Sequence, residues 1–217
     1  MTNYTEYRTT MVDTQVRPSD VTKFPIIEAM LAVPREAYVP TDKRDAAYAG
    51  ENIDLGNGRV MFEPRTLAKF LDALDIQPDE MVLHVGSGQG YSPAIIARMA
   101  DFVVALEEDE ALAAEAQATL SEHGVDNVAV VTGPLAQGAA KHGPYDVILI
   151  EGAIQDLPQA LADQLKEGGR IAALFADGML GIARIGYKID GKIAWRFLFN
   201  AGAPVLPGFT HEPEFAL

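Results

Sequence analysis

From residue 81 onward, short apolar runs alternate with stretches of helical periodicity. The apolar runs have the length of strands buried on both faces, and they predict strands at Met81–Val85, Val103–Leu106, Val128–Val131, Val147–Ile150 and Arg170–Leu174. The stretches between them predict helices at Pro93–Met99, Glu110–His123 and Leu157–Leu165. Strands that alternate with helices favour right-handed crossovers, so the sheet is expected to be mostly parallel.

The last apolar runs are not separated by a helix. Ile182–Ile189 and Lys192–Phe199 are separated by Asp190–Gly191, a dipeptide that suits a type I′ hairpin turn. The sequence therefore predicts an α/β fold whose mostly parallel, seven-stranded sheet ends in an antiparallel hairpin.

The first sixty residues have a helical character of their own. Ser19 and Asp20 can cap a helix that carries apolar side chains through Leu31, and Asp54–Gly58 resembles a turn-rich loop. Pro64 then opens an amphipathic helix. We expect residues 1–62 to form an N-terminal helical extension on the substrate side and residues 63–217 to form the cofactor-binding domain.

Composition narrows the class of protein. The chain has 217 residues, 48% hydrophobic and 22% charged, which is ordinary for one globular domain, but its formal charge is −14. A surface this acidic repels phosphate backbones, so nucleic acid is not expected as a partner. With no cysteine, no secretory pattern in Met1–Thr10 and no membrane-length apolar run, we expect a cytoplasmic protein away from membranes. The apolar tail Ala203–Phe215 is expected to pack on its own core, although contact with another subunit of an oligomer is an alternative.

The strongest chemical signal is a glycine-rich turn directly after the first predicted strand. Gly86, Gly88 and Gly90 form G-x-G-x-G, whereas the dinucleotide fingerprint G-x-G-x-x-G would need glycine where Tyr91 stands. Without that third glycine, the helix that follows is less suited to receive a pyrophosphate, so the turn favours a ligand without phosphates. Glu107 ends the next strand, where a carboxylate can accept hydrogen bonds from both hydroxyls of a ribose.

Several further segments carry a family resemblance. They are Val33–Pro34–Arg35–Glu36 with Tyr38–Val39–Pro40, Ala47–Tyr48, Leu83–Tyr91, Val104–Glu107, Gly143–Ile148 and Leu165 with Gly168–Arg170. With these motifs the chain resembles the protein-L-isoaspartate O-methyltransferases, which methylate isoaspartyl carboxylates of damaged proteins with S-adenosylmethionine. The resemblance covers about residues 17–174 and implies a Rossmann-like, class I methyltransferase fold. It also implies a protein or peptide substrate that bears a carboxylate.

The resemblance also implies site residues. The candidates for holding S-adenosylmethionine are Gly86, Ser87, Gly88 and Gly90 at its methionine part, Glu107 at its ribose and Leu135 near its adenine. Glu108 is a further cofactor-binding candidate.

Four departures from the family pattern lie at this site. Phe62 stands where the family has a serine that reaches the substrate carboxylate, and it cannot donate a side-chain hydrogen bond. His84 replaces an acid, Pro134 replaces the aspartate beside the adenine, and Glu151 stands in an ordinarily apolar segment. We include His84, Pro134 and Glu151 among the cofactor candidates, and Phe62 with Arg59 as catalytic candidates. Arg59 is the cation that could compensate for the lost hydroxyl.

Two other functions remain open. The joint change of Phe62, His84 and Pro134 is compatible with a regulatory protein that keeps the fold and binds the cofactor but is catalytically impaired. A nicotinamide dehydrogenase is disfavoured by Tyr91 and by the terminal hairpin. Because cysteine is lacking and the histidines show no ligand spacing, no metal is expected.

Overall fold

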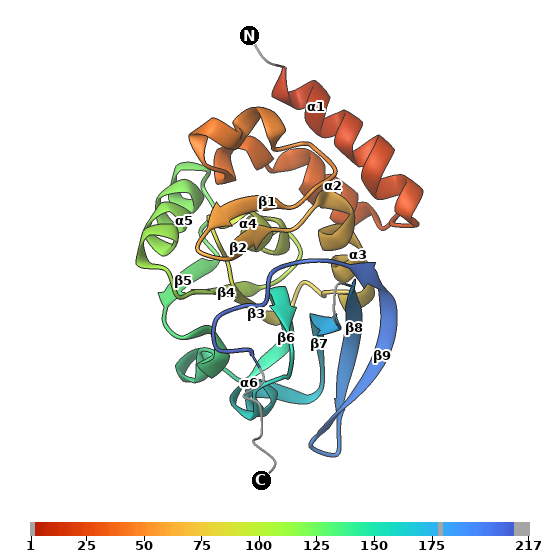
Figure 1. Ribbon diagram of the computed structural model, residues 1–217, viewed down its shortest axis with the longest axis vertical. Coiled ribbons are helices and arrows are strands. Elements are labelled where there is room, and N and C mark those ends of the chain that lie inside the picture. The colour runs from red at the N-terminus through yellow and green to blue at the C-terminus, as the bar shows by residue number, and fades with distance from the viewer. Residues whose placement is uncertain (1–2, 178–179, 211–217) are drawn as a thin grey trace.

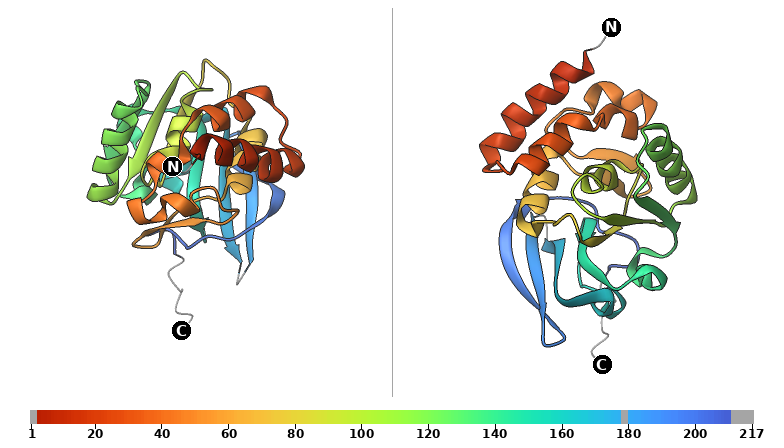
Figure 2. Two further views of the ribbon diagram at one scale, coloured as in Figure 1. Left: turned by 90° about the horizontal axis from the view of Figure 1, so that it is seen from above. Right: turned by 180° about the vertical axis from the view of Figure 1, so that it is seen from behind.

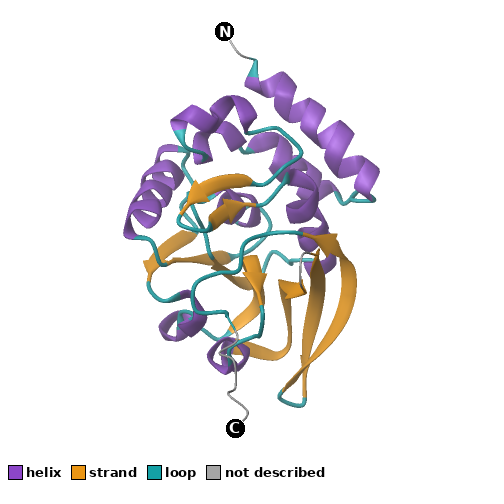
Figure 3. Cartoon of the chain, in the orientation of Figure 1, coloured by secondary structure: helices purple, strands orange, loops and turns teal. Residues whose placement is uncertain are grey.

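The computed structural model describes residues 3–177 and 180–210. Its main sheet has the order β5-β4-β3-β6-β7-β8-β9, parallel from β5 to β7 and antiparallel for the last two strands (Figures 1 and 3). The strands are β3 (Met81–Val85), β4 (Phe102–Glu107), β5 (Val128–Thr132), β6 (Tyr145–Ile154), β7 (Leu165–Asp177), β8 (Leu180–Ile189) and β9 (Lys192–Ala201). The predicted seven-stranded architecture is confirmed.

Both faces of the inner parallel strands β3, β4 and β6 are buried, which explains their continuous apolar runs, whereas the edge strand β5 is half-buried. Val82, Val103 and Val147 pair in register and belong to one core cluster, whereas their neighbours Leu83 and Val104 belong to the other. Successive strand side chains point to opposite faces, so each apolar run supplies both layers of core.

The helices surround this sheet, and the N-terminal ones gather at one end of the molecule (Figure 2). They are α1 (Tyr4–Met11), α2 (Phe24–Ala32), α3 (Pro64–Leu74), α4 (Tyr91–Ile96), α5 (Glu110–Glu122) and α6 (Gln159–Gln164). Helix α3 begins at the predicted proline. Helix α6 ends one residue before the expected Leu165, because Leu165 pairs with Tyr145 as the first residue of β7.

The predicted cap of α2 is wrong. The Ser19 hydroxyl donates to the backbone oxygen of Gln15, and Asp20 adopts a left-handed φ of 65°. The hydroxyl is therefore engaged by the preceding turn, and α2 begins only at Phe24, with proline in its first turn.

The expected loop at Asp54–Gly58 is instead a small hairpin of β1 (Ile53–Gly56) and β2 (Arg59–Met61). Asn57 and Gly58 at its tip have φ values of 50° and 71°, as the turns of tight hairpins require. The hairpin lies between the N-terminal helices and the carboxyl end of β3 (Figure 1). It is the element that determines the shape of the candidate site.

Residues on both sides of position 62 share one core, which includes Met11 and Ile27 as well as Val82. The division of the chain into an extension and a domain stays a prediction.

The described part of the C-terminal tail packs as expected, with Leu206 and Phe209 buried and a bridge from Val205 to Ala153; the tail beyond residue 210 lies outside the described residues. None of the helices in the described ranges is both long and apolar enough to cross a membrane.

Asp109 is expected to stabilise α5 in a pH-dependent way. Its carboxylate accepts hydrogen bonds from the Asn57 side chain and from the backbone amides of Ala111 and Leu112, and these bonds lower its pKa. Asp109→Ala should lower the free energy of unfolding at neutral pH by about 1 kcal/mol, measured by urea denaturation. Because the folded pKa is depressed, this difference should persist above about pH 4 and shrink as the pH falls through the folded pKa. Asp79→Ala, at an exposed position, is the control.

Candidate active site

The glycine-rich turn connects β3 to α4 at the carboxyl end of the parallel strands. Gly86, Gly88 and Gly90 have φ values of 85°, 52° and 94°, a left-handed conformation that favours glycine. The backbone amides of Gly86 and Ser87 both donate to the carbonyl of Leu106. The turn is thus fastened to β4 immediately before Glu107.

Glu107 forms a buried, two-pronged ion pair with Arg59 of β2. The distances are 2.9 Å from Arg59 Nη2 to Oε2 and 3.2 Å from Arg59 Nε to Oε1, and the two side chains are 3% and 0% exposed. This arrangement is the parallel fork typical of arginine–carboxylate pairs. Arg59, which the sequence suggested as a partner for the substrate carboxylate, therefore pairs with Glu107, the residue predicted to bind the ribose.

Backbone amides occupy the remaining acceptor positions of Glu107. Gly88 donates to Oε2 at 2.7 Å, while Glu108 and Asp109 donate to Oε1 at 2.8 Å and 3.1 Å. Together with Arg59, five donors converge on two carboxylate oxygens, which have about four lone-pair sites. Glu107 has no acceptor capacity left for a ligand in this conformation.

A second buried pair lies beside the first. His84 Nε2 is 3.1 Å from Glu151 Oε2, a contact close enough for an ion pair but not aligned as a hydrogen bond. Glu151 Oε1 accepts the backbone amide of Phe62 at 2.8 Å, and His84 Nδ1 lies 3.3 Å from the Ser87 hydroxyl. Glu151 thus links the glycine-rich turn to the segment that carries Phe62.

Phe62 itself belongs to the core. Its ring is fully buried and stacks on Phe70 with centroids 5.8 Å apart. Its carbonyl accepts a hydrogen bond from Arg35 Nη2 at 2.7 Å, and the Arg35 guanidinium lies 4.7 Å from the centroid of the Tyr91 ring. Burial raises the pKa of Tyr91, against the opposing effect of Arg35, so the stacked ring is a neutral phenol.

Three further predicted site residues are Glu108, Pro134 and Leu135. Glu108 contributes its backbone amide to Glu107, but its side chain is exposed. Pro134 is exposed as well, and Leu135 is buried in the second core cluster.

The space in front of the turn is filled by the chain itself. A Cβ on Gly86 would lie 2.6 Å from Arg59 Nη2, and one on Gly88 would lie 2.5 Å from Leu55 Cδ1. What remains between the hairpin and the turn cannot hold a water-sized sphere. Leu206 of the tail packs against Gly152 of β6.

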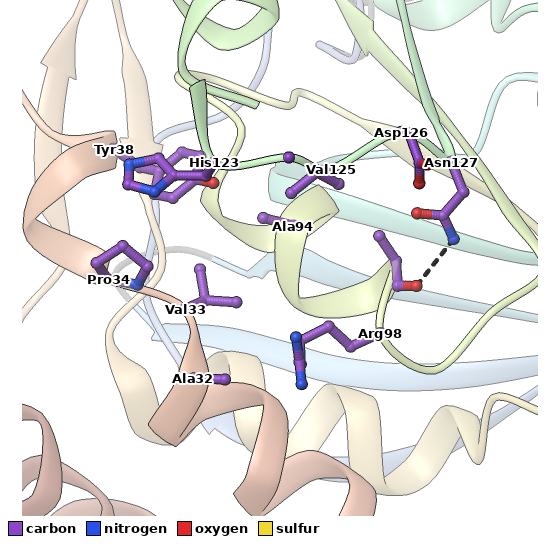
Figure 4. A pocket seen from close by; sticks show the side chains of 12 residues that line it. Ala32, Val33, Pro34, Tyr38, Ala94, Arg98, His123, Val125, Asp126 and Asn127 are labelled. Carbon is purple, nitrogen blue, oxygen red and sulfur yellow. Dashed lines mark hydrogen bonds between the residues drawn. The ribbon is translucent and has the colours of Figure 1, made fainter. Parts of the chain in front are cut away.

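Larger cavities lie elsewhere. One of about 440 Å³ is lined on one side by the tilted rings of Tyr38 and His123, whose centroids are 5.7 Å apart, and on another side by Arg98 (Figure 4). Burial raises the pKa of Tyr38 to about 12. Another, of about 560 Å³, lies outside the hairpin, between it and α5.

Comparison with known proteins identifies the family. The sequence profile described as Protein-L-isoaspartate(D-aspartate) O-methyltransferase matches residues 8–192. The chain belongs to this family. The protein-L-isoaspartate O-methyltransferase of Koribacter versatilis is 36% identical over 171 residues, which cover 79% of this chain and 77% of that protein.

Two solved structures share the fold of this family member. A protein-L-isoaspartate O-methyltransferase aligns with a TM-score of 0.81 and 23% identity over 93% of this chain, which spans 66% of that chain's length. A Plasmodium falciparum protein, described as a putative member in complex with S-adenosyl-L-homocysteine, aligns with a TM-score of 0.79 and 20% identity over 95% of this chain and 99% of its own. The predicted family, methyltransferase class and S-adenosylmethionine dependence are thus confirmed at the level of the family.

The described conformation does not fit that cofactor. The left-handed glycines and the acid at the end of β4 are in place, but Arg59 lies against Gly86, Leu55 lies against Gly88, and Glu107 is saturated. An adenosine-bearing ligand would have to displace the hairpin side chains before it could reach the turn.

Two residues at this site were missed by the sequence patterns. Leu55 covers Gly88, and Asn57 donates to Asp109 at 2.9 Å, which ties the hairpin tip to the β4–α5 loop. The signal that could have found them is the Asn57–Gly58 dipeptide, a strong indicator of a two-residue hairpin turn.

Proposed function

We propose that this chain is an S-adenosylmethionine-dependent carboxyl O-methyltransferase that acts on a protein or peptide carboxylate. The observation that carries the proposal is the placement of Glu107 beside the glycine-rich turn, at the carboxyl ends of the adjacent parallel strands β3 and β4 of a family member's sheet. The residues proposed to contact the cofactor are His84, Gly86, Ser87, Gly88, Gly90, Glu107, Glu108, Pro134, Leu135 and Glu151.

We also propose that the site for the methyl-accepting carboxylate differs from that of the family. A carboxylate is ionised at neutral pH, so the acceptor needs positioning rather than proton removal. Phe62 offers no hydroxyl there, and its ring is committed to Phe70 in the core. We therefore expect isoaspartyl peptides to be poor acceptors for this protein.

Labelled methyl esters provide the test. The protein is incubated with methyl-labelled S-adenosylmethionine and an isoaspartyl peptide, and label released as methanol by base is counted against the aspartyl peptide of the same sequence. A small excess for the isoaspartyl peptide is expected, and Phe62→Ser should increase it about tenfold or more through the restored donor. Phe62→Ala is the matched control, since it leaves a similar cavity without a hydroxyl. Equal counts for the two peptides with both the wild type and Phe62→Ser would contradict the proposal.

A second candidate function is favoured by the filled site. The buried pairs Arg59–Glu107 and His84–Glu151 close the space that a cofactor needs, as would suit a regulatory homologue that has lost turnover. Binding of S-adenosylhomocysteine without methyl transfer to any carboxylate would favour this candidate. The absence of a nucleic-acid partner, oligomerisation and a cytoplasmic location stay predictions.

A further inference from the structure

The carboxylate oxygens of Glu107 are the acceptors that a ribose would use, and Arg59 of the same chain already donates to them. The Arg59 guanidinium presents two parallel N–H donors to the two carboxylate oxygens at 2.9 Å and 3.2 Å. Two neighbouring ribose hydroxyls would present the same pair of donors to the same carboxylate. The guanidinium and the ribose are therefore alternative partners of Glu107.

The packing around Arg59 supports the same conclusion independently of hydrogen bonding. Bare glycine backbone in such turns lets a ligand approach closely. Here Arg59 Nη2 makes that approach at Gly86, and Leu55 of the same hairpin makes it at Gly88. One strand pair thus fills both positions that the glycines leave free.

The hairpin is held in this place at several points. Asn57 donates to Asp109 at 2.9 Å, Lys43 Nζ donates to the Asp54 carbonyl at 2.6 Å, and Arg59 pairs with Glu107 at 2.9 Å. Of these three contacts only the Arg59–Glu107 pair is fully buried, so moving Arg59 away is costly unless another donor takes its place on Glu107.

From these contacts we propose that Arg59 is an internal occupant of the cofactor's ribose position, so that S-adenosylmethionine enters only when Arg59 leaves Glu107. The proposal rests on the proposed function and adds a gate to it. If the open form makes up about 1% of the molecules, the apparent affinity for the cofactor falls about 100-fold. Arg59 is thus a positioning residue for the hairpin.

The test is a calorimetric titration of the full chain with S-adenosylhomocysteine. Arg59→Ala should bind about 100-fold more tightly than the wild type, because the space against Gly86 opens and Glu107 regains its acceptor positions. Arg65→Ala removes the same charge from an arginine that is 41% exposed near the start of α3, and it should bind like the wild type. Arg59→Lys keeps a cation near Glu107 without the fork; it should bind with intermediate affinity and gives a second variant if Arg59→Ala does not fold.

A competition experiment adds a readout that general loosening of the structure would not produce. Methylguanidine at millimolar concentration should weaken S-adenosylhomocysteine binding to Arg59→Ala by returning a guanidinium to Glu107. It should have no effect on the wild type, where Arg59 occupies that position.

The outcomes separate the gate from the function. Wild-type binding as tight as that of Arg59→Ala overturns the gate alone. If folded Arg59→Ala and Arg59→Lys both fail to bind, the gate and the cofactor of the proposed function are overturned together. Tight binding by Arg59→Ala without base-labile methyl esters on any carboxylate supports the gate and contradicts the proposed activity.

Discussion

Glu107→Ala is expected to destabilise the protein by about 4 kcal/mol, because it leaves the Arg59 guanidinium buried without its counter-ion. The backbone amides of Gly88, Glu108 and Asp109 lose their acceptor at the same time. Urea denaturation at neutral pH measures the loss. Glu108→Ala, at the exposed neighbouring side chain, should change the free energy of unfolding by less than about 0.5 kcal/mol.

A double-mutant cycle shows whether the loss belongs to the ion pair. Arg59→Ala alone should also destabilise the protein, since it leaves Glu107 without its cation. The double variant should be more stable than the sum of the two losses implies, with a coupling of at least about 2 kcal/mol. Additive losses to within about 0.5 kcal/mol would show that the two side chains act independently and would contradict the geometry described here.

The parallel sheet was predictable because burial on both faces leaves a signature in the sequence that is independent of the rest of the chain. A run such as Met81–Val85 is apolar whichever helices cover it, and the Asp190–Gly191 turn fixes the terminal hairpin locally. Helix ends were less predictable. Ser19 has the right chemistry for a cap, but a backbone carbonyl one turn earlier accepts its hydroxyl.

Only the part of the site that lies at the ends of the parallel strands was predictable. Gly86 and Glu107 lie at the ends of adjacent parallel strands, so the strand pattern alone brings them together. Arg59 reaches Glu107 across 48 positions of sequence, from a hairpin that the sequence pattern had favoured as a loop. An isolated arginine is usually a surface residue, and nothing in its local sequence indicates that a tertiary contact will bury it.

Arg35→Met is the second substitution for which we expect a large effect, about 3 kcal/mol lost from the free energy of unfolding. Arg35 is fully buried; its Nε donates to the Ala47 carbonyl at 2.6 Å and its Nη2 to the Phe62 carbonyl at 2.7 Å. Methionine fills a similar volume but leaves both carbonyls unsatisfied, at a cost of about 1–3 kcal/mol each. Removing a buried charge returns part of that cost. Arg44→Met, at an exposed arginine of the same region, is the control and should be close to neutral.

Arg35→Lys distinguishes the charge of Arg35 from its shape. If a cation over the Tyr91 ring were sufficient, lysine would restore most of the stability that methionine loses. The two carbonyls that Arg35 bridges belong to segments separated by the β1–β2 hairpin, and a planar guanidinium can donate to both while it stacks on Tyr91. A lysine ammonium carries its donors at one point, so we expect it to recover less than half of the loss. Full recovery in urea denaturation would show that charge alone accounts for the contribution of Arg35.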